Sequence, residues 1–148
     1  MATTGKVAGK LIKVWIDDDP ESLGGSGNKL LAGCQTDFNL NRSTSSLEAN
    51  CKDDGNFSDA VPDKNSSSFD LGLLMKFDAD FNYAELVAIS DNQTICEVTM
   101  STGEVGDPED VAIAFMTELG ESAPVEGIAE ISTSWQCKGQ ITHGTVSA

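Results

Sequence analysis

The sequence predicts a mainly β protein, an antiparallel β-sandwich or barrel with one short flanking α-helix. Segments rich in β-branched and aromatic residues recur at fairly regular spacing along the 148 residues, and turn-forming residues separate them. Only one segment carries the signals of a helix start. About seven or eight strands are expected, in one domain over residues 1–148, because a chain of this length usually forms one core.

The first two strands are expected near the N-terminus. Residues 10–16 are rich in β-branched side chains and alternate apolar with polar positions, which predicts a strand. Residues 17–28 form an acidic, glycine-rich turn, and Leu30 and Leu31 begin a second strand. The three aspartates at 17–19 could bind calcium, but no glycine-directed ligand spacing follows them. A solvated turn is the favoured interpretation.

A polar segment over residues 34–47 has Phe38, Leu40 and Leu47 as its candidate inward-pointing residues. Apolar side chains occupy every second position of residues 69–77, and this is the clearest strand pattern in the sequence. These two segments are expected to lie on either side of a long loop.

That loop is predicted at about residues 50–68, where the sequence is polar and acidic. A loop of this length inside a compact domain is usually functional or disordered. Phe57, Val61 and Pro62 are apolar residues within it. Two interpretations stay open: these residues fold back on their own domain, or they dock on a neighbouring copy.

The single expected helix covers Tyr83 to Ser90. Residues 78–82 begin like an EF-hand loop, but the required glycine and the final glutamate are absent. The same segment is better explained as a helix start, with Asn82 as the cap and Glu85 as the other half of a capping box.

The C-terminal part is expected to hold further strands at residues 93–100, 111–116, 128–137 and 140–146. Residues 120–124 are predicted to break the chain. Alternation places the following residues on one face of the segment 128–137: Ala129, Ile131, Thr133, Trp135 and Cys137.

The charge balance excludes some functions. Twenty-four acidic residues against nine basic ones give a formal charge of −15, which opposes a direct grip on nucleic acid. Either solubility or a specific electrostatic role would explain this acidity. The sequence has no apolar run of membrane-spanning length, and its start lacks the apolar region of a signal peptide. A protein made and kept in a cytoplasm is expected.

Groups suited to catalysis are few. The chain has one histidine, no nucleophile-elbow motif and no phosphate-binding glycine loop, so we expect no enzymatic activity and no cofactor. The four cysteines are widely separated without a C-x-x-C pair, which disfavours a zinc site. Cys51, Cys96 and Cys137 are expected to be small buried residues without disulfides.

The order of several segments resembles a known family. The segments are the N-terminal Met-Ala-Thr-Thr-Gly-Lys, Ala32 to Thr36, Ser43 to Asp53, the aromatic Phe69, and the ending from Ala123 to Ile141. Together they are similar to the major tail proteins, or tail tube proteins, of long-tailed bacteriophages and related gene transfer agents.

This resemblance implies a structural role. Six copies would form a ring, and stacked rings would form a hollow tube in the virion tail, through which DNA leaves the capsid without specific binding. Assembly would take place in the host cytoplasm, with the tape measure, tail tip and terminator proteins as further partners and no membrane. Six copies at −15 each would carry roughly −90, and an anionic wall does not hold DNA.

The resemblance also implies that the loop after Lys52 is an arm that bridges subunits or rings. The residues expected in the subunit-interface loop are Lys52, Asp53, Asp54, Phe57, Val61, Pro62 and Phe69.

The alternative function is a carbohydrate-binding or adhesin-like module, in which the side chains of Trp15, Tyr83 and Trp135 would stack on sugars. The two tryptophans lie in alternating strands, however, and this position favours packing.

Overall fold

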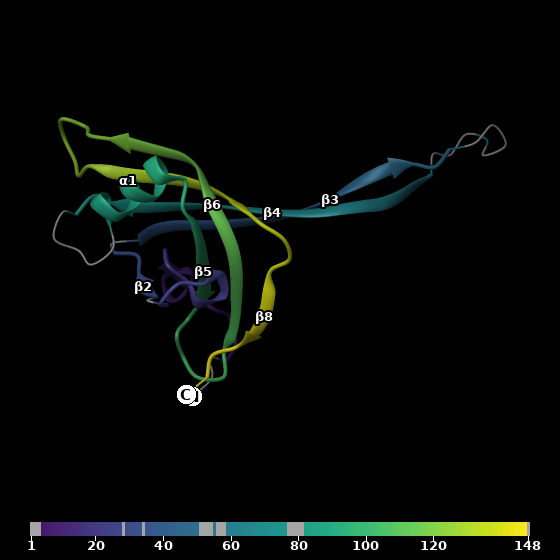
Figure 1. Cartoon of the computed structure of the whole chain (residues 1–148), viewed down its shortest axis with the longest axis horizontal. Coiled ribbons are helices and arrows are strands. Elements are labelled where there is room, and N and C mark those ends of the chain that lie inside the picture. Colours follow the sequence, from purple (N-terminus) through teal and green to yellow (C-terminus); the bar gives the residue numbers. More distant parts are fainter. Residues whose placement is uncertain are drawn as a thin grey trace.

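The structure, a computed structural model, describes residues 4–27, 29–33, 35–50, 55, 59–76 and 82–147. Within these ranges the chain forms eight strands, one α-helix and two short 3-10 turns (Figure 1). The strands are β1 (Lys13–Asp17), β2 (Leu30–Leu31), β3 (Gln35–Glu48), β4 (Ala60–Leu74), β5 (Ile95–Ser101), β6 (Pro108–Ser122), β7 (Glu130–Cys137) and β8 (Thr142–Thr145), and the helix is α1 (Tyr83–Asn92).

All eight strands belong to one antiparallel sheet with the order β2-β1-β5-β6-β7-β4-β3, and β8 pairs with β6. β6 pairs with β5 through residues 109–115 and with β7 through residues 114–122. A bulge between Met116 and Glu118 interrupts the second pairing, and bulges bend strands. In Figure 1, β3 and β4 therefore run horizontally, while β5 and the first half of β6 run vertically. The predicted fold class, mainly antiparallel β with one short helix, is confirmed.

The core lies between the two differently directed parts of the sheet. Val14 and Val98 from one part and Leu71 and Trp135 from the other belong to the same cluster of buried residues. α1 packs against β6 and adds Leu86 to this cluster. The β7 residues that alternation predicts to face inward are buried: Ile131, Thr133, Trp135 and Cys137.

Asn82 connects the helix start to two other segments and is fully buried. Its side-chain Nδ2 donates to the carbonyl oxygens of Gly33 at 3.0 Å and Leu74 at 3.1 Å, and its Oδ1 accepts from the Lys76 amide at 2.9 Å. Its backbone N–H donates to the Glu85 carboxylate at 3.2 Å, as the capping box predicts. One side chain thus caps α1 and holds it against the end of β4.

Several predicted boundaries differ from the structure: α1 ends at Asn92 and not at Ser90, β6 covers residues 108–122 and not 111–116, and β8 covers residues 142–145 and not 140–146. The strand predicted over residues 10–16 begins at Lys13, because a 3-10 turn precedes it. The break predicted to begin at Gly120 comes only after Ser122, where β6 ends. Gly120 lies opposite Ser132 in the register, and a Cβ at this position would approach the Ser132 Oγ to 2.9 Å. This glycine allows a close contact between strands and is not a breaker.

The largest difference concerns the loop predicted at about residues 50–68. Residues 60–68 belong to β4 and pair with β3, so that these strands are connected by residues 49–59. Alternation identifies a strand only where one face is buried and the other exposed. Residues 60–66 are exposed throughout, which removes that signal. The polar composition of the segment therefore resembles that of a loop.

Replacing Asn82 with alanine is expected to lower the free energy of unfolding by about 3 kcal/mol, because the buried carbonyl groups of Gly33 and Leu74 lose their donor. The control Glu85→Gln keeps a side-chain acceptor for the cap amide and should cost less than about 1 kcal/mol. Urea denaturation followed by circular dichroism measures both variants. Equal losses would contradict a special role of the Asn82 side chain.

Candidate functional site

Strand β4 loses one of its two neighbours partway along its length. From Ser68 to Leu73 it pairs with β3 on one side and β7 on the other, whereas the arm residues between 60 and 67 pair with β3 alone. Residues 42–48 and 60–67 form a two-stranded ribbon that projects from the body of the protein, and we call this ribbon the arm (Figure 1). At about 3.4 Å per residue, residues 60–67 span about 25 Å.

Polar side chains connect the two strands of the arm. The Oγ atoms of Ser43 and Ser66 lie 2.8 Å apart, and the Thr44 hydroxyl donates to the Asn65 Oδ1 at 2.7 Å. These contacts replace the apolar pairs that hold a buried sheet together. An isolated two-stranded ribbon is only marginally stable in water, so the arm gains stability from any surface against which it packs.

One face of the arm is apolar at its centre and acidic around it. Leu47 and Val61 lie directly opposite each other, so both side chains point to the same face, and they are 54% and 46% exposed. Asp59 and Asp63 lie two residues to either side of Val61. The Ala49 N–H donates to the Asp59 carbonyl oxygen, which continues the pairing to Asp59. A register shift sets both Asp63 and Lys64 opposite Ser45, and the Ser45 hydroxyl, on the same face as Leu47, donates to the Asp63 Oδ2 at 3.4 Å. We call these four residues the arm face. Pro62 lies on the opposite face and is also exposed.

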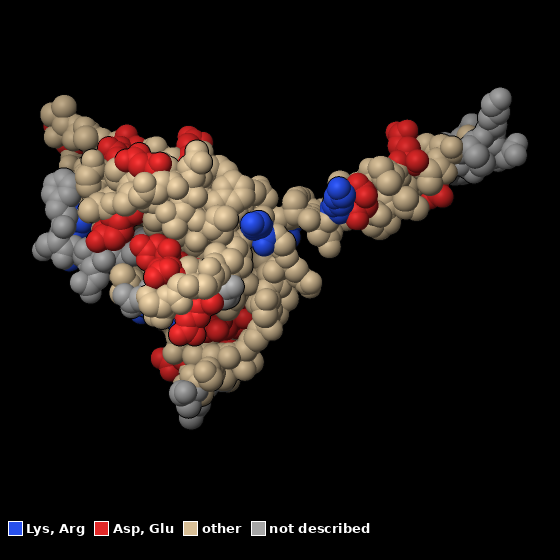
Figure 2. Space-filling model, viewed as in Figure 1, with Lys and Arg blue, Asp and Glu red and all other residues tan. Residues whose placement is uncertain are grey.

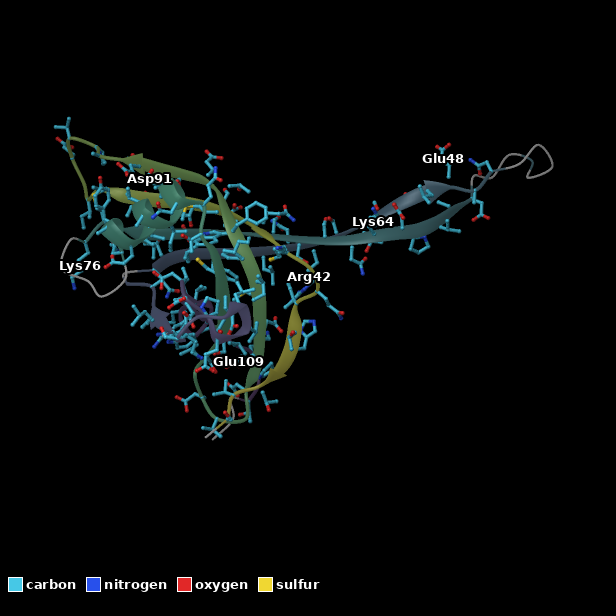
Figure 3. All side chains as sticks on the ribbon, in the orientation of Figure 1. Arg42, Glu48, Lys64, Lys76, Asp91 and Glu109 are labelled. Atoms are coloured by element: carbon cyan, nitrogen blue, oxygen red, sulfur yellow. The ribbon has the colours of Figure 1, made fainter. Side chains whose placement is uncertain are left out.

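A charged cluster holds the root of the arm to the body. The Arg42 Nη2 donates to the Asp110 Oδ2 at 3.0 Å, and the His143 Nδ1 lies 2.6 Å from the Asp110 Oδ1. Arg42 belongs to β3, Asp110 to β6 and His143 to β8. The Asp110 carboxylate therefore contacts side chains of both β3 and β8. Figure 3 shows Arg42 at this root and Glu48 and Lys64 further out along the arm. These contacts link the root of the arm to the body.

Phe69 lies immediately inside the root and is 1% exposed. Its ring stacks on Trp135, with 5.6 Å between centroids and 10° between planes, and lies 5.7 Å from the ring of Phe38. The Trp135 Nε1 donates to the Thr133 Oγ1 at 2.8 Å, and that hydroxyl donates to the Leu71 carbonyl at 2.9 Å. Phe69 is therefore a core residue of the subunit. The sequence-based prediction placed it in the subunit-interface loop, but its side chain is buried and cannot contact a neighbouring copy.

The other predicted interface residues divide into two groups. Val61 and Pro62 are exposed on the arm, as docking on a neighbour requires. Leu47 was predicted to point inward, yet it faces solvent, and only the strand register reveals Val61 as its partner. The remaining predicted residues lie outside the described part of the chain: Lys52, Asp53, Asp54 and Phe57.

The aromatic residues considered for sugar stacking offer little surface. Trp135 is buried, so its ring cannot stack on a ligand. Trp15 is half-buried, and the Lys29 Nζ lies 5.7 Å from its ring centroid. Tyr83 is half-buried at the start of α1. The carbohydrate-binding alternative therefore loses one of its three stacking faces.

The buried cysteines are poor nucleophiles. Burial raises the pKa of Cys96 to about 12, with the charges of Asp18 and Asp17 adding to the effect, and burial also raises the pKa of Cys137. Among the described residues, His, Cys, Asp and Glu side chains form no group of three that could hold a metal ion. Asp19, in the turn considered for calcium, accepts a hydrogen bond from the Ser26 hydroxyl at 2.9 Å.

Among the charged side chains on the visible face of the body, acidic ones are more widespread than basic ones (Figure 2), in line with the formal charge of −15. Basic side chains are few in this view, and Figure 3 places Arg42 at the root of the arm and Lys64 along it. No helix in the described ranges has the length and apolar character needed to cross a membrane.

A pair of substitutions tests the different environments of Phe69 and Val61. Phe69→Ala should lower the free energy of unfolding by about 3–5 kcal/mol, because it opens a cavity beside Trp135. Val61→Ala, at an exposed arm position, should change it by less than about 0.5 kcal/mol. Chemical denaturation of the monomer measures both. Similar losses for the two variants would place Phe69 outside the core.

Comparison with known proteins supports a fold assignment. No protein-family model and no curated protein matches the chain. A chain from the tail of an empty gene transfer agent particle matches with a TM-score of 0.76 and 14% identity, covering 95% of this chain and 100% of that one. The SPP1 tail tube matches with a TM-score of 0.79 and 15% identity, covering 97% of this chain and 81% of that one. A chain of the anti-feeding prophage baseplate matches with a TM-score of 0.68 and 8% identity, covering 99% of each chain. The chain thus has the fold seen in tail tube proteins.

Proposed function

We propose that the protein is the structural subunit of a phage-type tail tube. Six copies form a ring, and stacked rings form the channel through which DNA passes from the capsid to the host. The fold, shared over nearly the whole chain with a gene transfer agent tail of C6 symmetry and with the SPP1 tail tube, supports this role. The protein works as a part of the virion tail and has no enzymatic activity.

The arm is the observation that carries the proposal. It exposes Leu47 and Val61 on a ribbon that extends away from its own core. Exposed apolar groups on a marginally stable ribbon favour contact with another surface. Because the body lies behind the root of the arm, that surface belongs to a neighbouring copy. The arm therefore bridges subunits within a ring or between rings.

The acidic composition supports the passage of DNA. Each copy carries a formal charge of −15, so a ring of six carries roughly −90. A channel of this charge repels the phosphate backbone and gives DNA no place to bind. DNA then slides through the tube without specific contacts.

Further tail proteins complete the assembly. Matches to an anti-feeding prophage baseplate and to a sheath-tube complex of a contractile injection system support contacts between this fold and other tail components. The tape measure, tail tip and terminator proteins are the partners that we propose. Assembly takes place in the host cytoplasm before the tail joins the virion.

An armless variant tests the proposal directly. Replacing residues 45–64 with Asn-Gly joins Thr44 to Asn65, which are already paired, through a two-residue turn. The variant should keep the circular dichroism spectrum of a folded monomer, because the described residues that it removes are exposed. It should form neither rings nor tubes. Negative-stain microscopy and sedimentation velocity of the concentrated protein measure the loss.

A milder pair of variants separates the two faces of the arm. Leu47→Ser combined with Val61→Ser removes the apolar pair but keeps the ribbon, and it should weaken assembly. Ala60→Ser, on the opposite face, is the matched control and should assemble normally. Tubes of normal length from the armless variant would refute the bridging role, and a wild-type protein that stays monomeric would refute the tail tube function.

A further inference from the structure

A groove of about 560 Å³ lies between the segment that precedes β1 and the turn that connects β2 to β3. Ala32 and Phe38 line it and also belong to, or pack against, the core. Ile12 and Leu31 line it as exposed apolar side chains. We call this feature the N-terminal groove. It presents apolar groups in a concave surface of the body.

Basic residues outnumber acidic ones along the N-terminal groove, although the protein as a whole is acidic. Lys10 and Lys13 line it, both are exposed, and neither forms an ion pair within the described ranges. Asp37 is the only acidic residue among its lining residues. In a chain with 24 acidic and nine basic residues, two available lysines beside one apolar groove form a distinct binding surface for an acidic partner.

The arm face has the complementary chemistry. Its apolar pair, Leu47 and Val61, matches the exposed apolar side chains of the groove. Its carboxylates, Asp59 and Asp63, carry the charge opposite to that of Lys10 and Lys13 in the groove. Burying an apolar pair between opposite charges gives both attraction and orientation.

We propose that the arm face of one copy docks in the N-terminal groove of a second copy. This inference rests on the proposed tail tube function and names the surface that receives the arm. The contact joins two different surfaces, head to tail, and repeating such a contact produces a closed ring or an open stack. Both outcomes suit a tube built from rings.

The arm cannot reach the groove of its own subunit. Phe38, which lines the groove, and Leu47, on the arm face, lie on the same strand, β3. Nine residues of strand separate them by about 30 Å. In Figure 1 the arm extends to the right, away from the purple N-terminal segment. A second copy is therefore the occupant that the geometry allows.

A second exposed apolar surface on the body suits the arm less well. The turn between β6 and β7 exposes Val125 and Ile128. Three exposed glutamates accompany them, Glu121, Glu126 and Glu130. Like charges placed opposite each other oppose association, so these residues repel the acidic arm face.

Charge reversal with rescue tests the proposal. Lys10→Glu with Lys13→Glu should lower assembly at a given protein concentration by at least about tenfold, since it places like charges opposite the arm face. Asp59→Lys with Asp63→Lys should do the same. The variant that carries all four changes should assemble again, because each contact regains opposite charges. Sedimentation velocity and negative-stain microscopy measure assembly, and circular dichroism confirms that each variant is folded.

The control variant, Lys6→Glu with Lys138→Glu, reverses the charge at two exposed lysines outside the groove. It changes the net charge by the same amount as the Lys10 and Lys13 variant. It should assemble like the wild type. Normal assembly of the Lys10 and Lys13 variant, or no rescue in the fourfold variant, would overturn the groove proposal while the tail tube function stands. A wild-type protein that never assembles would overturn the tail tube function, and the groove proposal with it.

Cross-linking provides a measurement that does not depend on charge. In a background with Cys34→Ser and Cys51→Ser, the remaining cysteines are buried. Val61→Cys with Leu31→Cys should then form disulfide-linked multimers in assembled protein on non-reducing gels. Val61→Cys with Ile128→Cys is the matched control and should stay monomeric. Multimers in the control alone would place the arm on the wrong surface and overturn the proposal.

Discussion

The stack of Phe69 on Trp135 is the contact on which the rest of the structure depends. It lies one residue from Ser68, where β4 makes its last pairing with β7. Inside this point, β4 is held by two neighbouring strands and by the core. Outside it, the same strand continues with β3 alone as the arm. A buried aromatic stack thus lies at the base of the exposed ribbon, and the contacts of Asp110 with Arg42 and His143 link that base to β6 and β8.

The body and the arm are stabilised by different interactions. The body buries apolar side chains in one cluster, and this burial is the main favourable term in folding. The arm holds its strands together with hydrogen bonds between exposed polar side chains, such as Ser43 with Ser66, each of which has a small net value in water. The subunit can therefore fold alone, while its arm gains most when it packs against another molecule. This division suits a protein that folds first and assembles afterwards.

Charge gives the proposed assembly its orientation. Copies with a formal charge of −15 repel one another over most of their surfaces. Lys10 and Lys13 in the N-terminal groove create one place where an acidic arm is attracted. A single attractive contact on a repulsive surface disfavours other arrangements. The acidity that we propose keeps DNA free in the channel would then also restrict how subunits meet.

The amino-acid sequence by itself determined the antiparallel β class, the helix with its Asn82 cap and the buried face of β7, because these features depend on local signals such as alternation and capping. It identified Val61 and Pro62 as apolar residues in an unusual segment. Only the tertiary structure decided that this segment is largely strand, that Leu47 faces solvent beside Val61, and that Phe69 is buried. The physical reason is that a ribbon exposed on both faces has no hydrophobic alternation, and its register is set by pairing between residues distant in sequence.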